Sequence, residues 1–261
     1  MSHFSDDWQS WRAAREQRLR SPRGWLAITA IHWLTEEPQR FDDVPGAWQH
    51  DGQGPTVTLA EGESLTSDDG VLGAGLHVLG ELDEYGLLFS FGNAVAEVAG
   101  RDGTTIVRPR HPDSRNLTAY AGTPCYPPDE RWAIPARFEA YDAPRPTPGG
   151  AQDEIAVGEV VFRHAGTEHR LVAWDGGDGS LWILFRDATS GRTTYPANRQ
   201  LYPGRPAADG NVLLDFNRAL NMPCAYTDFA TCPVVPAANT LPFAVEAGEQ
   251  IPLGVPVTTH P

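Results

Sequence analysis

Glycine and proline interrupt this chain so often that they restrict the folds open to it. The 261 residues include 26 glycines and 23 prolines, spread along the whole length. Glycine supplies the positive φ angles of tight turns, and proline interrupts helices and the interior of sheets. This composition favours many short strands joined by turns over long helices. We therefore predict a mainly β protein with antiparallel sheets in a barrel-like or sandwich-like arrangement.

The pattern of apolar residues supports this prediction. Large apolar residues alternate through residues 87–91, and the alternation resumes after a Gly92-Asn93 turn and again after an Asp102-Gly103 turn. Alternation with a period of two is typical of half-buried strands, and both dipeptides favour tight hairpin turns. We predict a three-stranded meander here. Further strands are expected at residues 155–163, 170–174, 181–185 and 212–217.

The N-terminal region has a different pattern. Phe4, Trp8, Trp11 and Leu19 recur at nearly helical spacing, so we predict an amphipathic helix over residues 5–20. The apolar run that follows, residues 24–34, is predicted to be a buried strand. We expect residues 1–24 to pack as a helical segment on one β-rich domain, residues 25–261. A subdivision near residues 142–152 is the alternative, because that stretch is rich in proline and glycine.

The charge balance excludes several classes of function. The formal net charge is −14, whereas a nucleic-acid-binding protein needs a basic face. One short basic stretch, residues 12–23, is interpreted as a solvated helix face. A membrane-spanning helix needs about 18 consecutive apolar residues, and the sequence contains no such run. Residues 1–8 do not resemble a signal peptide. We therefore predict a cytoplasmic protein with no nucleic-acid or membrane partner.

The most unusual block is residues 215–232, which places polar residues and two of the three cysteines among prolines. If residues 212–217 form a strand, Asp215 and Asn217 project from the same face. Arg218 follows and can reach back to Asp215. We predict that Asn217 contacts a ligand, that Arg218 holds an anionic group, and that Asp215 orients Arg218 or acts as a base. A loop clamp without function is the alternative.

A second polar segment, residues 186–199, is the expected spatial partner of this block. Thr189 and Ser190 lie in a polar turn, and Tyr195 and Arg199 share a face if the chain between them is extended. Hydroxyls, a phenol and arginines together suit a carboxylate or phosphate. These four residues are predicted to bind the ligand. A solvated loop followed by an edge strand explains the same pattern equally well.

The cysteines allow three interpretations. Cys224 and Cys232 are separated by seven residues, and the chain has neither a Cys-x-x-Cys nor a His-x-x-x-His motif, so no metal site is predicted. Both can be small buried residues that fix a proline-rich loop. Cys224 can instead be a reactive nucleophile whose pKa is lowered by Arg218. A redox-dependent disulfide between the two is the third interpretation.

Several motifs of the chain carry a resemblance to a known family. They include Phe185-Arg-Asp-Ala-Thr-Ser-Gly191, Leu214-Asp-Phe-Asn-Arg-Ala219, Pro223-Cys-Ala225, Ala230-Thr-Cys-Pro233 and Glu246-Ala-Gly-Glu249. With these motifs the chain resembles a family of bacterial and archaeal proteins catalogued as domain of unknown function 1684. The resemblance covers most of the sequence and is most specific in the C-terminal third. It implies no established activity, cofactor or catalytic residue.

Three functions remain open from the sequence. The first is a site for a small anionic molecule, either catalytic or only ligand-binding, onto which the predicted residues converge. The second is a non-catalytic module that binds a flavin or another phosphate-bearing cofactor through Thr189, Ser190, Gly191 and Arg199. The third is a purely structural role, in which the polar side chains of the C-terminal motif satisfy backbone groups of loops. The sequence identifies neither the cofactor nor the oligomeric state.

Overall fold

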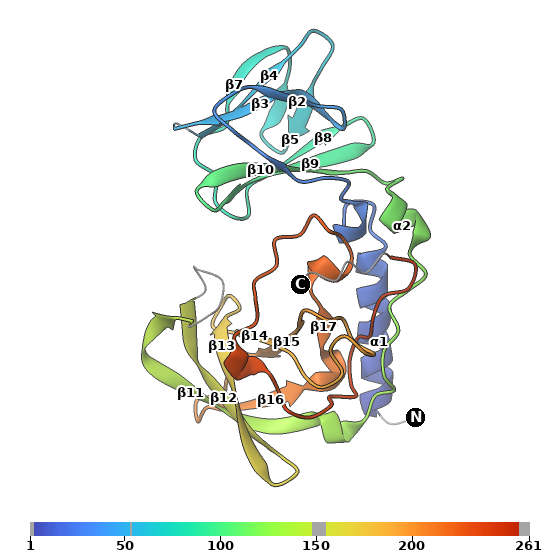
Figure 1. The fold of residues 1–261 in the computed structure, drawn as a ribbon, viewed down its shortest axis with the longest axis vertical. Helices are drawn as coiled ribbons and strands as arrows, with labels where there is room; N and C mark the ends of the chain where they lie inside the picture. Colours follow the sequence, from blue (N-terminus) through green and yellow to red (C-terminus); the bar gives the residue numbers. More distant parts are fainter. Residues whose placement is uncertain (1–2, 53, 148–154, 256–261) are drawn as a thin grey trace. The chain divides into compact units, whose positions relative to one another are not determined.

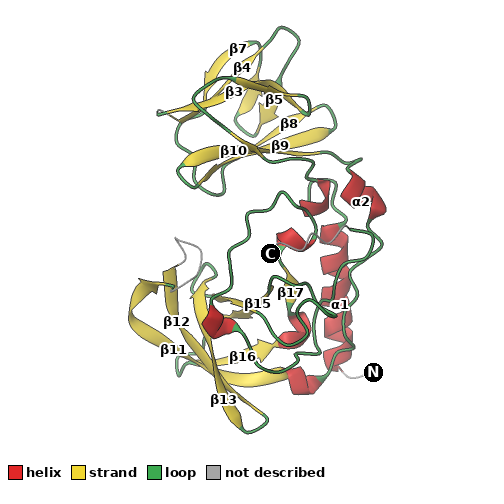
Figure 2. Cartoon of the chain, in the orientation of Figure 1, coloured by secondary structure: helices red, strands yellow, loops and turns green. Residues whose placement is uncertain are grey.

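The structure is a computed structural model, and it describes residues 3–52, 54–147 and 155–255. Antiparallel strands dominate and helices are few, which confirms the predicted fold class (Figures 1 and 2). The chain divides into two compact units. Unit 1 contains residues 1–16 and 121–261, and unit 2 contains residues 17–120. The predicted single domain over residues 25–261 stays a prediction, and residues 148–152 of the possible subdivision lie outside the described residues.

Unit 2 is built from two antiparallel sheets. One has the strand order β1-β10-β9-β8-β5-β6 and the other β2-β3-β4-β7. Large apolar side chains from both sheets, including Trp48, Val57, Phe89 and Val98, form a common core. The elements of unit 2 are η1 (Trp25–Ala27), β1 (His32–Trp33), β2 (Gln39–Phe41), β3 (Val44–Asp51), β4 (Gly54–Leu59), β5 (Leu65–Ser67), β6 (Gly70–Leu72), β7 (Gly75–Val78), β8 (Leu87–Phe91), β9 (Ala94–Arg101), β10 (Thr104–Arg110) and α2 (Arg115–Ala119).

The predicted meander is present as β8, β9 and β10. Its second turn places Asp102 at φ 49° and Gly103 at φ 76°, the left-handed geometry that Asp-Gly hairpins adopt. The prediction for residues 24–34 was wrong. This run forms the 3-10 helix η1 and only the two-residue strand β1. Leu26 and Ala27 are fully buried, so the apolar run is core material, but its burial does not require an extended backbone.

Unit 1 is organised around one curved antiparallel sheet. Its described strands follow the order β16-β11-β12-β13-β14-β15-β17 and form a half-barrel. The inner face carries a core that includes Val160, Ile183, Phe185 and Phe216. The elements are η2 (Glu130–Trp132), β11 (Ala133–Pro146), β12 (Ile155–His164), β13 (Thr167–Asp175), β14 (Leu181–Phe185), β15 (Arg199–Gly204), β16 (Asn211–Asp215), η3 (Phe216–Arg218), β17 (Leu220–Asn221), η4 (Pro223–Ala225) and η5 (Ala237–Asn239).

The N-terminal helix α1 (His3–Leu19) confirms the predicted helix and lies beside the C-terminal segment in Figure 1. Trp8 donates its indole N–H to the carbonyl of Asn217 at 3.0 Å. Arg15 pairs with the buried Glu249 carboxylate at 3.0 Å. Burial alone would lower the pKa of Arg15, but the Glu249 carboxylate raises it overall. This arginine therefore anchors α1 and does not belong to the solvated helix face that the sequence suggested.

Asn239 fills a gap in the sheet of unit 1. Strands β13 and β14 pair only at Trp174–Trp182 and Asp175–Leu181. Beyond these pairs, the Asn239 side chain accepts from the N–H of Val172 at 2.7 Å and donates to the carbonyls of Val172 and Leu184 at 2.9 and 2.7 Å. One buried amide thus satisfies three backbone groups that a neighbouring strand would otherwise bind.

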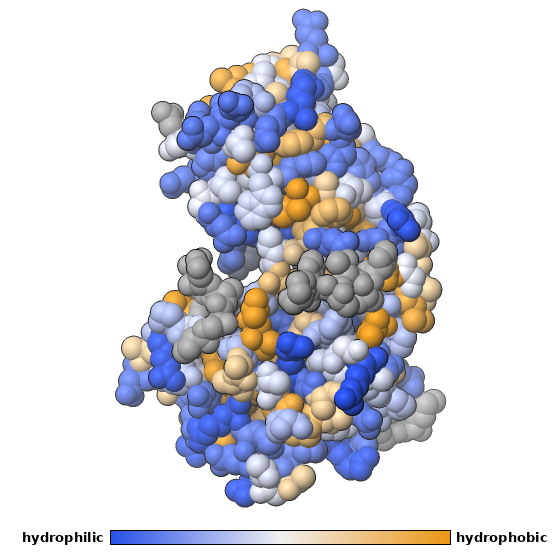
Figure 3. All heavy atoms as spheres, viewed as in Figure 1, coloured by the Kyte–Doolittle hydropathy of each residue, from blue (hydrophilic) through white to orange (hydrophobic). Residues whose placement is uncertain are grey.

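The surface of the described residues is mainly hydrophilic in the view of Figure 3. Hydrophobic residues lie in small groups among the hydrophilic ones. Within the described part of the chain, we find no helix that has both the length and the apolar character needed to cross a membrane.

Candidate functional site

Arg199 is buried at the start of β15, where a carboxylate and backbone carbonyls bind its guanidinium. The side chain is 1% exposed, and its Nη2 lies 2.8 Å from Oδ2 of Asp187. The guanidinium also donates to the carbonyl of Val245 at 3.1 Å and to that of Ala247. Burial lowers the pKa of Arg199, whereas the Asp187 carboxylate raises it. These contacts fasten the C-terminal segment to the sheet, as a structural clamp does.

Thr189 and Ser190 complete the turn around this ion pair. The hydroxyl of Thr189 donates to Oδ1 of Asp187 at 2.6 Å and contacts the hydroxyl of Thr194 at 2.8 Å. Ser190 Oγ accepts from the N–H of Asp187 at 3.2 Å. Both hydroxyls hold the polar turn in place. Contact with a phosphate, as the sequence suggested, would require these hydrogen bonds to break.

Asp215, Asn217 and Arg218 lie together at the end of β16. Asp215 Oδ1 accepts from the backbone N–H of Asn217 at 3.1 Å and from its side-chain amide at 2.9 Å, so Asp215 caps the 3-10 helix η3. Arg218 reaches back to Asp215 as predicted, with Nε at 3.3 Å from Oδ2, and also pairs with Asp7 of α1. The strand ends one residue before Phe216, so Asn217 is held by a helical turn and not by strand alternation.

Asp215 and Arg218 line a cavity of about 420 Å³ in unit 1. Its walls come from α1, β15, β16, η3 and β17. Arg218 lies over the ring of Trp11, 5.7 Å from the centroid, and both its ion-pair partners are near the same cavity. Each charge here therefore has an opposite charge beside it. The lining residues are Phe4, Asp7, Trp11, Leu201, Tyr202, Pro203, Leu213, Asp215, Arg218 and Leu220.

Tyr195 and Cys224 line a separate cavity of about 490 Å³, which we call the thiol cavity. The Tyr195 hydroxyl donates to the carbonyl of Cys224 at 2.8 Å and so fixes the start of η4. The backbone N–H of Cys224 donates to Sγ of Cys232 at 3.2 Å. The lining residues are Arg186, Tyr195, Pro196, Ala197, Asn198, Cys224, Ala230, Thr231, Cys232, Pro233, Val234 and Val235.

Two residues of the thiol cavity were missed by the sequence-based selection. Arg186 is exposed, and within residues 3–52, 54–147 and 155–255 no ion pair involves its side chain. Asn198 is buried and donates to the carbonyl of Pro233 at 3.1 Å, which anchors the opposite wall. The alternation of side chains along the strand at residues 181–185 could have identified Arg186 as a residue that points away from the core. Because Ile183 and Phe185 face the core, the residue that follows them is expected to point away from it.

The three thiols differ in their surroundings. The hydrogen bond with the Cys232 side chain is the largest influence on Cys224 and lowers its pKa, although burial opposes this effect. Burial raises the pKa of the Cys125 thiol to about 12. None of the three forms a disulfide within the described residues. Cys224 is a better candidate nucleophile than Cys125, because the thiolate is the reactive form.

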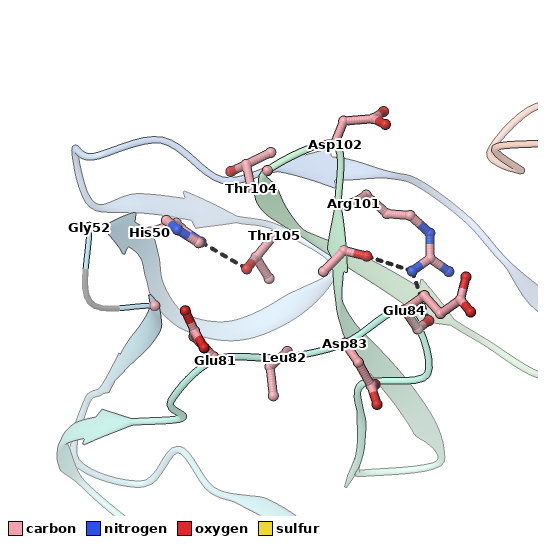
Figure 4. A pocket seen from close by; sticks show the side chains of 13 residues that line it. His50, Gly52, Glu81, Leu82, Asp83, Glu84, Arg101, Asp102, Thr104 and Thr105 are labelled. Atoms are coloured by element: carbon pink, nitrogen blue, oxygen red, sulfur yellow. Dashed lines mark hydrogen bonds between the residues drawn. The ribbon is translucent and has the colours of Figure 1, made fainter. Parts of the chain in front are cut away.

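Unit 2 contains a larger cavity, of about 860 Å³, which Figure 4 shows from close by. His50 and Glu81 face each other across it, and Nδ1 of His50 lies 2.9 Å from the hydroxyl of Thr105. Arg101 donates to the backbone carbonyls of Glu84 and Gly100. The acidic side chains of Glu81, Asp83, Glu84 and Asp102 make this cavity unsuited to an anion.

The eight residues selected from the sequence therefore do not converge on one cavity. Asp215 and Arg218 line one cavity, Tyr195 and Cys224 another, and Thr189, Ser190, Asn217 and Arg199 line neither. Within the described residues, no group of three or more histidine, cysteine, aspartate or glutamate side chains is arranged to hold a metal ion.

Comparisons with known proteins identify one family. The sequence profile of the family described as Protein of unknown function (DUF1684) matches residues 118–250, which confirms the resemblance seen in the motifs. An uncharacterized protein of Haloarcula marismortui, solved by solution NMR, is 30% identical; the match covers 49% of this chain and 76% of that chain, with a TM-score of 0.42. No curated protein matches the chain. Both smaller cavities of unit 1 include residues within the matched range.

Proposed function

Because the chain belongs to the family described as Protein of unknown function (DUF1684), we propose a function from the geometry of unit 1: the thiol cavity binds a small molecule that carries a carboxylate or phosphate group. Arg186 would hold the anionic group. The apolar wall of prolines, alanines and valines would contact the rest of the molecule, and the ring of Tyr195 would close one side.

The observation that carries this proposal is the unpaired charge of Arg186. Among the described residues, Arg199 and Arg218 both have carboxylate partners, whereas Arg186 has none. A guanidinium presents its donors in a planar fork that matches carboxylate and phosphate oxygens. A guanidinium without a carboxylate partner on the wall of a cavity is the feature expected of an anion site.

The size and lining of the cavity support the same function. Ligand sites commonly measure about 300–1,000 Å³ and combine an apolar wall with a few polar groups. The thiol cavity, at about 490 Å³, has this composition. The cavity around Asp215 and Arg218 is comparable in volume, but its charges are already paired. The cavity of unit 2 is larger and acidic.

The catalytic arrangement suggested by the sequence is not part of this proposal. Asp215 and Cys224 line different cavities, so Asp215 has no path to act as a base for a Cys224 nucleophile in one site. The phosphate-binding module suggested by the sequence also relied on Arg199, Thr189 and Ser190. Those side chains bind Asp187 and its neighbours.

A thermal-shift screen with small carboxylates, phosphate and phosphate esters tests the proposal. An anion that binds the folded protein raises the melting temperature with its concentration. We expect R186A to lose this rise and to retain the melting temperature of the ligand-free protein. R192A removes another exposed arginine of unit 1 outside the cavity, and it should respond like the wild type. An equal loss in R192A, or an unchanged response in R186A, would contradict the assignment.

A further inference from the structure

Cys224 and Cys232 lie in contact on the wall of the thiol cavity, although seven residues separate them in the sequence. The backbone N–H of Cys224 donates to Sγ of Cys232 at 3.2 Å. A disulfide requires Cα atoms about 4.4–6.8 Å apart and sulfur atoms that can meet. A thiol held against the backbone of its partner satisfies the second requirement with little movement.

The two cysteines also differ in the way that reversible oxidation requires. Cys224 is the buried central residue of η4, and its carbonyl accepts a hydrogen bond from the Tyr195 hydroxyl at 2.8 Å. Cys232 is half-buried in the loop that follows, which is held by the bond from Asn198 to the carbonyl of Pro233. One thiol is thus fixed, and the other lies on a loop segment that forms the opposite wall. Cys224 lines the thiol cavity, through which a small oxidant can reach it, and Cys232 lies beside it as a thiol that can resolve a sulfenic acid.

We propose that this pair is a redox modification site: a hydroperoxide converts the two thiols into a reversible Cys224–Cys232 disulfide. The Cys224 thiolate attacks one peroxide oxygen, the O–O bond breaks, and the other oxygen leaves and is protonated to water or an alcohol. Cys224 is then a sulfenic acid. The Cys232 sulfur attacks the Cys224 sulfur, an S–S bond forms, and the hydroxyl group leaves as water. The two thiols supply the two electrons and two protons that reduce the peroxide.

The disulfide would change the cavity that Arg186 shares. A bond between η4 and the 230–235 loop ties two walls of the thiol cavity together, so the oxidised and reduced proteins should bind an anion with different affinity. This consequence rests on the proposed function. Formation of the disulfide does not, since it depends only on the two thiols and the oxidant.

Mass spectrometry of the native full-length protein tests the disulfide directly. After brief exposure to hydrogen peroxide, we expect a mass loss of two hydrogen atoms, a linked peptide pair containing Cys224 and Cys232, and reversal by dithiothreitol. C224S and C232S should each abolish the link. C125S is the matched control and should form it normally, because burial keeps the Cys125 thiol protonated. If one serine variant fails to fold, the other and the wild-type peptide map still decide the result.

Three outcomes would overturn the proposal: three free thiols after oxidation, irreversible oxidation of Cys224 without a link to Cys232, or a link that involves Cys125. R186A separates this proposal from the anion site. If R186A and the wild type both form the disulfide but no anion raises the melting temperature of either, the proposed function fails and the redox site stands. If an anion binds the wild type but peroxide forms no disulfide, the redox site fails and the proposed function stands.

Discussion

Two arginines of unit 1, Arg199 and Arg186, show how differently the same side chain is used. Arg199 is 1% exposed, pairs with Asp187 at 2.8 Å and donates to carbonyls of the C-terminal segment. Arg186 flanks the same carboxylate in sequence, yet it is exposed on a cavity wall and has no ion pair within the described residues. Desolvation explains the difference. A guanidinium buried away from water needs a carboxylate beside it, whereas an exposed guanidinium is solvated by water.

This contrast separates structure from function in the polar C-terminal region. Arg199, Asn239 and Asp215 each satisfy groups of the protein itself. Removing them should therefore lower stability. The Arg186 side chain has no ion-pair partner among the described residues. Its removal should therefore weaken ligand binding and leave the stability of the fold almost unchanged. The following substitutions test this separation, from the largest expected effect on stability to the smallest.

Asp187→Ala should have the largest effect. It leaves the Arg199 guanidinium buried without its carboxylate and also removes the acceptor for the N–H groups of Thr189 and Val245. Breaking one partner of a buried ion pair costs about 3–5 kcal/mol. Urea denaturation should show this loss in the free energy of unfolding. The control E168A removes one carboxylate from the exposed Arg170 network and should leave it almost unchanged. Equal effects would contradict the clamp.

Asn239→Ala should be the next most destabilising. Without the amide, the N–H of Val172 and the carbonyls of Val172 and Leu184 lose their partners. An unsatisfied buried polar group costs about 1–3 kcal/mol. Hydrogen exchange should accelerate at Val172 more than at the paired ends of β13 and β14. N211A, which removes an exposed asparagine of β16, is the control. Unchanged exchange at Val172 would show that Asn239 does not hold the gap.

Asp215→Ala addresses a residue that the sequence analysis placed in a catalytic role. The substitution removes the cap of η3, which is expected to cost about 0.5–2 kcal/mol. The melting temperature should fall while any anion-induced rise persists, because Asp215 does not line the thiol cavity. Loss of the anion response without loss of stability would instead favour the site predicted from the sequence.

Arg186→Ala should have the smallest effect on stability, within about 0.5 kcal/mol of the wild type. Its effect on anion binding should be the largest of the four variants. Urea denaturation and the anion titration together measure both quantities on the same protein. A destabilisation comparable to that of Asp187→Ala would mean that Arg186 is another structural arginine, and the contrast between the two would disappear.

Local patterns predicted much of the fold. The helix α1, the meander β8–β10 and the strands β12–β14 follow from apolar spacing and turn residues, which are properties of neighbouring positions. Residues 24–34 were assigned wrongly because their apolar side chains follow neither the period of two of a strand nor the period of 3.6 of a helix. Such a run signals burial but does not determine whether the backbone is extended or helical.

The candidate site was harder to predict, for a physical reason. Whether an arginine binds a ligand depends on which charges the fold brings to it, and those lie far away in sequence. Arg199 meets the carbonyl of Val245, and Arg218 meets Asp7 of α1. Neither contact has a local signal. The sequence suggested a disulfide between Cys224 and Cys232 as one of three interpretations. Their contact, however, depends on how the proline-rich loop folds back.

The most direct test of the account is a crystal structure of the protein with the anion that most raises its melting temperature. We predict ligand density in the thiol cavity, with a carboxylate or phosphate oxygen within hydrogen-bond distance of the Arg186 guanidinium, and an intact Asp187–Arg199 pair. Density beside Arg218 and Asp215, or a ligand that displaces Asp187 from Arg199, would contradict the division between a structural and a ligand-binding arginine.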